Sequence, residues 1–360
     1  MFITILLAGI LLMHFIVITW TCLNINGLRY NAIAKLLPVL LSIIFVAGMY
    51  FTRVHGNGIA DILTKILYIW LGALFLWFIM VMAVMSLQLL LAVFKTQIPF
   101  KPGLPIFAAV VLLTIISVIN AARAPLIKVI DLTSPKISRT IKIAQISDTH
   151  LGDGVSVKQL QKLFAALAEH KPDIIVFTGD IFERSAARQM QAYADVINNF
   201  PAPEGKYGSL GNHEYYGGVA KNLHLWRLSG IEPLQNISAQ LDGINLIGIN
   251  DIRAGRVSRA EFVDIIKKSD TAKYTVALSH SPLYFKEAAD NGVDLLLSGH
   301  THNGQLWPFN LFVRIQFKHV YGMYKHGSLL HYITSGAFYW GPPMRFLTHN
   351  EVPLFIIKPQ

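Results

Sequence analysis

Long apolar segments with few polar interruptions dominate the first third of the chain. Four of them lie at residues 2–23, 36–51, 66–94 and 104–122. A helix needs about 20 apolar residues to cross the hydrocarbon core of a bilayer, and these segments are close to that length or longer. The first segment lacks a charged start and is followed by further apolar segments, which argues against a cleaved signal peptide. We therefore predict a transmembrane region of about four helices over residues 1–122.

The rest of the chain alternates short apolar runs with amphipathic segments. Runs short enough to be buried strands lie at residues 141–146, 174–178, 207–210, 244–249, 274–278, 293–297, 329–335 and 352–357. Helical spacing of apolar residues occurs at 157–170, 186–198, 219–228, 259–268 and 283–289. Strands that alternate with helices, followed by late strands, indicate two packed sheets with helices outside. We therefore predict an α/β fold, an αββα two-sheet sandwich, over residues 141–360.

Residues 123–140 are predicted as a linker between these two parts. Pro125 follows the last apolar segment, and Pro135 precedes the first strand of the second part. Proline disfavours the helical conformation of the residue before it, so both positions suit a boundary. The apolar stretch at 127–132 could add a short strand to the domain.

Composition supports a multi-pass membrane protein. The mean hydropathy of +0.46 is too high, and the charged fraction of 14% too low, for an ordinary soluble enzyme of this length. Cys22 is the single cysteine, so an intrachain disulfide is excluded and the redox compartment stays open. The net charge is +10, but no block of five like charges occurs, and we expect no nucleic-acid arm.

The side of the membrane is predicted from the short loops. An even number of spans places the start of the chain and the second part on the same side. The loops that carry Arg29 and Lys35, and Lys95 and Lys101, contain no acidic residue. Basic loops favour the cytoplasmic side, so we expect location in the cell membrane with an extracytoplasmic domain. Total counts of basic residues near the two sides are equal, and this expectation rests on the short loops alone.

Polar residues suited to metal binding follow five of the predicted strands. The clusters are Ser147-Asp148-Thr149-His150, Gly179-Asp180, Gly211-Asn212-His213-Glu214, Ser279-His280 and Gly299-His300-Thr301-His302. In α/β sheets the ligand crevice lies at the carboxyl ends of the strands, so these clusters should converge. Gly-Asp and Gly-Asn alone are turn signals, Asp148 alone could cap a helix, and His280 alone could be structural. Five clusters together favour a metal site.

In this order the clusters resemble the blocks D-x-H, G-D, G-N-H-[DE], a lone His and G-H-x-H of the calcineurin-like metallophosphoesterases. The resemblance covers roughly residues 138–360, and the extension Asn303-Gly304-Gln305 is similar to the membrane-anchored branch that acts on lipids and the cell envelope. It implies the αββα fold and two divalent metal ions. By resemblance, Asp148, His150 and His302 hold one ion, Asn212, His280 and His300 hold the other, and Asp180 bridges them.

The expected chemistry follows from this ligand set. Mixed oxygen and nitrogen ligands suit Mn²⁺, Fe or Zn²⁺ better than Ca²⁺. A hydroxide that bridges two ions would attack phosphorus in line. His213 is then free to protonate the leaving oxygen or to stabilise charge on the phosphoryl group. Arg345 resembles a position near the family's C-terminal loop, where it could bind a substrate phosphate through two hydrogen bonds.

The sequence therefore predicts a membrane-tethered, dinuclear-metal phosphoesterase. We expect it to hydrolyse a phosphodiester or pyrophosphate bond in a lipid or a lipid-linked envelope precursor, because a tethered hydrolase is best placed for a substrate held in the bilayer. The expected partners are the lipid bilayer and a phosphorylated, lipid-linked substrate, with no nucleic acid and no obligate protein partner. Two alternatives stay open: an anchored phosphomonoesterase or nucleotide hydrolase, and a metal-binding membrane sensor with little turnover.

Overall fold

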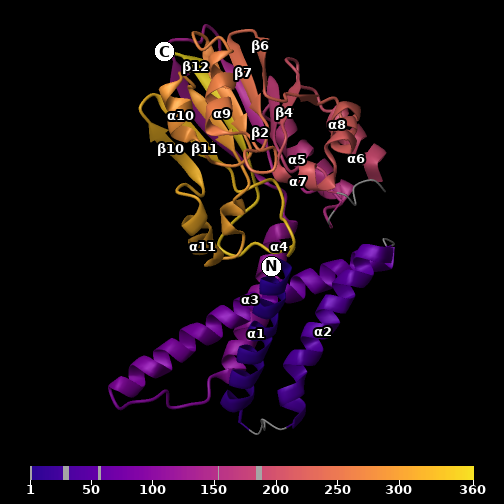
Figure 1. Ribbon diagram of the computed structural model, residues 1–360, viewed down its shortest axis with the longest axis vertical. Coiled ribbons are helices and arrows are strands. Elements are labelled where there is room, and N and C mark those ends of the chain that lie inside the picture. Colours follow the sequence, from indigo (N-terminus) through magenta and orange to yellow (C-terminus); the bar gives the residue numbers. More distant parts are fainter. Residues whose placement is uncertain (1, 27–31, 56–57, 153, 184–188) are drawn as a thin grey trace. The chain divides into compact units, whose positions relative to one another are not determined.

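The computed structural model describes residues 2–26, 32–55, 58–152, 154–183 and 189–360, and the chain forms two compact units (Figure 1). The helical unit comprises Met1–Asn120 together with Gly341–Phe346. The second unit comprises Ala121–Trp340 and Leu347–Gln360. A short segment near the end of the chain therefore belongs with the first unit.

The helical unit contains four helices that are long and apolar enough to cross a membrane, as predicted. They are α1 (Phe2–Asn24), α2 (Ala32–His55), α3 (Gly58–Val93) and α4 (Gly103–Ala122). α3 has 36 residues, more than a single crossing needs, which is consistent with a tilted helix or one that extends beyond the hydrocarbon. Arg29, which entered the prediction of sidedness, lies outside the described residues, and the side of the membrane stays a prediction.

A buried histidine, His14, joins three of these helices. Trp70 Nε1 of α3 donates a hydrogen bond to His14 Nε2 at 3.0 Å. Ser42 Oγ of α2 donates its proton to Pro38 O. The same oxygen therefore accepts a hydrogen bond from His14 Nδ1, at 3.0 Å. The ring is thus held neutral with both nitrogens paired. The sequence prediction did not single out His14, whose contacts are those by which polar side chains hold apolar helices together.

The second unit contains two six-stranded sheets. The first has the order β1-β12-β2-β3-β4-β5, formed by Leu126–Ser134, Glu351–Pro359, Ile141–Ile146, Ile174–Thr178, Lys206–Ser209 and Glu232–Pro233. The second has the order β10-β11-β9-β8-β7-β6, formed by Gly322–His326, Leu329–Ile333, Leu295–Ser298, Tyr274–Ser279, Ile244–Ile249 and Ile237–Leu241. β2, β3 and β4 are parallel, and so are β7, β8 and β9.

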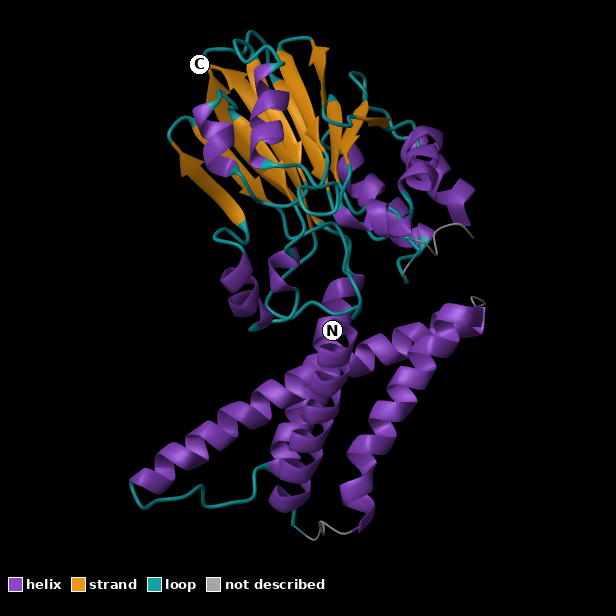
Figure 2. Ribbon diagram, viewed as in Figure 1, coloured by secondary structure: helices purple, strands orange, loops and turns teal. Residues whose placement is uncertain are grey.

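Helices cover the outer face of each sheet (Figure 2). One apolar core lies between the sheets, a second joins the first sheet to α5, α6 and α8, and a third joins the second sheet to α9 and α10. The helices are α5 (Val157–Ala168), α6 (Met190–Asn198), α7 (Asn212–Gly217), α8 (Val219–Leu228), α9 (Arg259–Lys267), α10 (Phe285–Asp290) and α11 (Phe309–Gln316). The predicted αββα sandwich is confirmed.

Several elements differ from the prediction. Half of the expected linker over 123–140 forms β1, which is longer than the short strand offered at 127–132 and pairs with β12 over nine residues in the first sheet. The expected helix over 186–198 begins at Met190 in the structure, and residues 184–188 lie outside the described part. The sequence did not predict α7, α11 or the edge strands β5, β6 and β10. α7 is only six residues long, and edge strands are half exposed, so both lack a strong periodic signal.

This topology places the predicted ligand clusters at one edge of the sandwich. Parallel strands present their carboxyl ends on the same side, and the clusters follow β2, β3 and β4 in one sheet and β8 and β9 in the other. Backbone hydrogen bonds join the loops directly: Asp148 N donates to Gly179 O at 3.1 Å, and Gly299 N donates to His280 O at 3.0 Å.

Candidate metal centre

The histidine and aspartate side chains predicted as metal ligands form two groups. Within each group the ligand atoms lie within 4.8 Å of one another. One group is Asp148, His150 and His302, and the other is Asp180, His280 and His300. The first matches a set assigned by resemblance, and the second contains two residues of the other set together with Asp180, which was expected to bridge; the ligand roles stay predictions. A third combination, His150, Asp180 and His213, joins them through Asp180.

Asp180 lies between the two groups. Its Oδ2 atom is 3.1 Å from His280 Nε2 and 4.0 Å from His150 Nε2, so one carboxylate oxygen faces a histidine of each group. Its Oδ1 atom accepts a hydrogen bond from His213 N at 2.8 Å. Burial alone would raise the pKa of Asp180, but the charge of His280 and its hydrogen bond outweigh burial and hold that pKa well below the usual value. An anionic carboxylate in this position suits a bridging ligand.

The first group brings two imidazole nitrogens and a carboxylate together. His150 Nε2 lies 3.2 Å from His302 Nε2, and Asp148 Oδ1 lies 3.3 Å from His302 Nε2. Two unprotonated ring nitrogens that face each other repel unless a proton or a cation lies beside them. All three side chains are buried, so water screens this repulsion poorly. A divalent cation would turn the arrangement into a stable one.

The His280 ring lies between a backbone carbonyl and the other members of the second group. His280 Nδ1 donates to Thr178 O at 2.7 Å, so Nε2, which lies 3.1 Å from Asp180 Oδ2 and 3.2 Å from His300 Nδ1, is the ring atom that faces the site. Metal-binding histidines commonly donate their other ring nitrogen to a carbonyl or carboxylate in this way, which fixes the ring and raises its basicity.

Asn212 supplies an independent test of whether the residues fit a metal. Its Oδ1 atom is buried and has no hydrogen-bond partner among the residues that the structure describes. An unpaired buried acceptor costs about 1–3 kcal/mol, so the oxygen needs a partner such as a cation. Asn212 is also the first residue of α7, and the next amide, of His213, donates to Asp180. The position of Asn212 beside Asp180 and its Oδ1 atom without a hydrogen-bond partner both fit the predicted ligand role.

The ligand loops are held in an unfavourable backbone conformation. Asp148, His150, Asp180, His300 and His302 have φ values between +43° and +70°, in the left-handed region that non-glycine residues avoid. Such strain persists only where the surroundings enforce it, and it is concentrated at functional sites. The neighbouring Gly299 allows this packing, because a Cβ atom there would overlap the Asp148 carboxylate. The glycine at this strand end is therefore a packing requirement of the site.

Glu214 holds the two central loops in register, a role that the sequence did not reveal. Its carboxylate is fully buried and accepts three backbone hydrogen bonds, from Asp180 N at 2.9 Å, Ile181 N at 2.8 Å and Gly211 N at 2.8 Å. Burial and the nearby charge of Asp180 raise the pKa of Glu214, while the backbone donors lower it. The only sequence signal was its place beside Asn212 and His213.

Glu183 orients two of the histidines. Its Oε1 atom accepts from His150 Nδ1 at 2.7 Å and lies 2.5 Å from His213 Nδ1. Burial opposes ionisation of Glu183, but these two histidines outweigh burial and lower its pKa to about 2. Burial likewise opposes charge on His213, but Glu183 and Asp180 raise its pKa to about 9. His213 Nε2 faces Asp180 Oδ2 at 4.0 Å.

The extension Asn303-Gly304-Gln305 supports one wall of the site. Gln305 Nε2 donates to Trp340 O at 3.1 Å, and Trp340 N donates to Gln305 Oε1 at 3.0 Å. The Trp340 ring in turn meets the His213 ring edge to face, with 5.7 Å between ring centres. Tyr216 flanks the same imidazole at 5.4 Å. The extension thus holds an aromatic side chain against the candidate proton donor.

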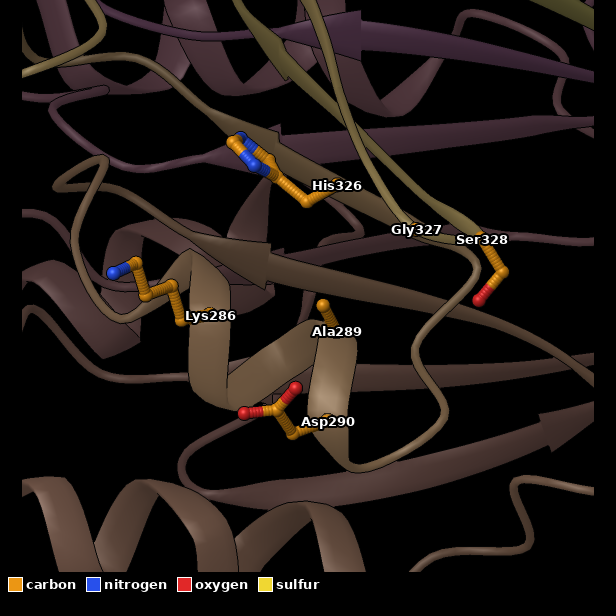
Figure 3. A pocket seen from close by; sticks show the side chains of 6 residues that line it. All are labelled: Lys286, Ala289, Asp290, His326, Gly327 and Ser328. Carbon is orange, nitrogen blue, oxygen red and sulfur yellow. The ribbon is translucent and has the colours of Figure 1, made fainter.

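Arg345 lies outside the unit that contains the ligand groups. It lies in Gly341–Phe346, the segment that belongs with the helical unit, and its side chain is fully buried. Arg345 N donates to Ser117 O of α4 at 2.8 Å. Its role in substrate binding stays a prediction. A separate depression beside α10, lined by Lys286, Ala289, Asp290, His326, Gly327 and Ser328, contains none of the predicted ligands (Figure 3).

Comparison with known proteins gives one consistent result. The family model described as calcineurin-like phosphoesterase matches residues 141–304. The chain is 32% identical over 247 residues to an uncharacterized metallophosphoesterase of Campylobacter jejuni, covering 67% of this chain and 66% of that protein. It is 33% identical over 224 residues to an uncharacterized metallophosphoesterase of Aquifex aeolicus, covering 61% of this chain and 85% of that protein.

A relative from Danio rerio shares the combination of parts. It is named transmembrane protein with metallophosphoesterase domain, and it is 30% identical over 267 residues, covering 68% of this chain and 60% of that protein. The chain therefore spans a little less than two thirds of the length of the Campylobacter and Danio relatives.

Replacing Glu214 should destabilise the candidate metal centre. Glu214→Gln places an amide among three backbone donors, and leaving buried donors unpaired costs about 2 kcal/mol or more. We expect a lower unfolding temperature and less bound metal for the full chain in detergent, measured by thermal unfolding and elemental analysis. Glu169→Gln, at an exposed position at the end of α5, is the matched control. Equal unfolding temperatures for the two variants would refute the role assigned to Glu214.

Two replacements of Glu183 should weaken metal binding to different extents. Glu183→Gln keeps an oxygen for His150 Nδ1 and His213 Nδ1 but removes the charge, whereas Glu183→Ala removes both. Loss of a group that orients a metal-binding histidine typically costs 10–100-fold in affinity. We expect the alanine variant to lose roughly that factor and the glutamine variant less, measured by chelator competition. Unchanged affinity in the alanine variant would contradict this account.

Proposed function

We propose that the chain, which belongs to the calcineurin-like metallophosphoesterase family, is a membrane-tethered dinuclear-metal phosphoester hydrolase. Its reaction would be hydrolysis of a phosphodiester or pyrophosphate bond in a lipid or lipid-linked envelope precursor. The observation that carries the dinuclear proposal is the position of Asp180, whose Oδ2 atom faces a histidine of each ligand group. A second shared ligand is not required, since one carboxylate can span two ions.

Each of the two ions has its own set of proposed ligands. Asp148, His150 and His302 would hold one, Asn212, His280 and His300 would hold the other, and Asp180 would contact both. The mixed oxygen and nitrogen donors support Mn²⁺, Fe or Zn²⁺. Two bound ions about 3.5–4 Å apart would supply an activated water and neutralise charge on the phosphoryl group. Glu183 and Glu214 keep the ligands in position through the hydrogen bonds described above.

His213 is the proposed proton donor. Its Nδ1 atom is engaged by Glu183, so Nε2 is the atom available to a substrate. The Glu183 carboxylate at Nδ1 raises the pKa of the ring and so favours its protonated form, from which Nε2 could give a proton to the leaving oxygen and lower the charge that develops there. General acid catalysis of this kind typically contributes about 10²–10⁴ in rate. The aromatic ring of Trp340 restricts the orientation of the imidazole.

The membrane helices support a substrate held in the bilayer. Four helices are long and apolar enough to cross a membrane, which is more than a simple anchor needs. A hydrolase confined to a membrane meets a lipid substrate at high local concentration, whereas a soluble substrate gains nothing from confinement. We propose the extracytoplasmic side for the catalytic unit, on the basis of the loop charges alone.

Turnover by the full chain in detergent tests this proposal. The substrates are bis-p-nitrophenyl phosphate, p-nitrophenyl phosphate and a lipid-linked pyrophosphate, each with Mn²⁺. We expect Asp180→Asn to abolish turnover because both ions lose a ligand. We expect His213→Gln to lower turnover about 10²–10⁴-fold while both ions stay bound, since its role is proton donation.

The controls separate the alternatives. Lys221→Gln, an exposed substitution on α8, should leave turnover unchanged. Preference for the monoester would favour an anchored phosphomonoesterase over the proposed substrate class. Two bound ions with no turnover on any substrate would sink the enzymatic proposal and favour a metal-binding sensor.

A further inference from the structure

Helix α11 (Phe309–Gln316) presents apolar side chains to its surroundings instead of to a core. The exposed fractions are 46% for Phe309, 54% for Leu311, 53% for Phe312 and 84% for Ile315. None of the residues of α11, all of which are described, is buried. Trp307, just before the helix, is also exposed. Figure 1 shows α11 outside the two-sheet sandwich of its unit.

The exposed residues form one continuous face. Phe309, Phe312 and Ile315 follow one another at intervals of three, and Leu311 and Ile315 are four apart, so these side chains lie on the same side of the helix. The other side is fixed to the domain: Gly304 lies so close to Asn310 that a Cβ atom would overlap its backbone. An ordinary surface helix has the reverse arrangement, with its apolar stripe towards the core.

We propose that α11 is an interfacial helix that lies in the bilayer, at the boundary of headgroups and acyl chains. The unit that contains α11 is joined closely to the membrane helices, because only residues 123–125 separate α4 from β1. At about 3.3–3.6 Å per extended residue, such a connection spans only roughly 10–14 Å between flanking elements. Helices with a large apolar face and basic residues at the polar side lie in membrane interfaces.

The side chains next to α11 also suit contact with a bilayer surface. Trp307 is an aromatic residue of the type enriched at membrane interfaces. Arg314 and Lys318 are exposed and could meet anionic headgroups. A protein partner fits less well, because large side chains that are about half exposed offer together a few hundred Å², below the roughly 800 Å² per partner of a stable interface.

This placement would set the depth of the metal centre. α11 begins seven residues after His302, and the loop between them is tied together by the bond from Leu306 N to Gly304 O, at 2.5 Å. Insertion of α11 would therefore hold the His300–His302 loop near the headgroups. The inference does not rest on the proposed substrate, because the depth of a helix can be measured without turnover.

Site-specific fluorescence tests the inference on the full chain. The background is Cys22→Ser, which removes the single natural cysteine. Ile315→Cys or Phe312→Cys would carry an environment-sensitive NBD label, in vesicles of phosphatidylcholine and phosphatidylglycerol. Both positions are exposed, so neither substitution removes core packing. We expect blue-shifted emission from both labels and its loss when nitroxide-labelled lipids are included.

Lys267→Cys, an exposed position on α9 of the same unit, is the matched control and should remain unshifted and unquenched. Labels on α11 that behave like the Lys267 label would overturn the proposal. A blue shift without quenching by nitroxide lipids would also overturn it, since it would place a protein surface over α11. Neither result would bear on hydrolysis, so failure here and failure of the proposed function are distinguishable.

Discussion

The candidate site depends on one buried carboxylate that faces histidines from both sheets. Asp180 follows β3 of the first sheet, and its Oδ2 atom lies 3.1 Å from His280, which follows β8 of the second. Burying that charge is costly unless opposite charges and donors surround it. The surrounding imidazoles meet this need in part, and divalent ions would meet it fully. The packing of two sheets against each other is thus what brings the ligands together.

The residues around this carboxylate form a supporting layer whose members act through one another. Glu214 fixes the backbone of Asp180 and Gly211, and Glu183 fixes the rings of His150 and His213. Both side chains are buried or nearly so. Glu214 accepts hydrogen bonds from the loop after β3, and Glu183 contacts histidines of two other loops. Positive φ values at the ligand loops show how much strain this layer holds in place. Such preorganisation keeps the ligands ready for metal without further movement.

The sequence predicted that the ligand clusters converge because each cluster directly follows an apolar strand, and strand ends can be recognised locally. The division into two ligand groups came from the family resemblance. The sequence left the roles of Glu183 and Glu214 open between contacts to neighbouring ligands and exposure to solvent, since a carboxylate that accepts from distant loops looks like any loop carboxylate in the sequence. The sequence offered a short strand at 127–132, but its place in the first sheet is set by pairing with β12, which the sequence alone does not reveal. α11 was not predicted although its apolar residues share one face, because the segment has only eight residues; Arg345 was assigned by resemblance, and it lies in the segment that belongs with the helical unit.

The central claim, that Asp180 joins two ions, is tested most directly by electron paramagnetic resonance of the full chain loaded with Mn²⁺. Two ions about 3.5–4 Å apart with a shared carboxylate should give the spectrum of an exchange-coupled pair. Asp180→Asn should lose that coupled signal. A spectrum of isolated, uncoupled Mn²⁺ in the unaltered protein, at saturating metal, would contradict the account.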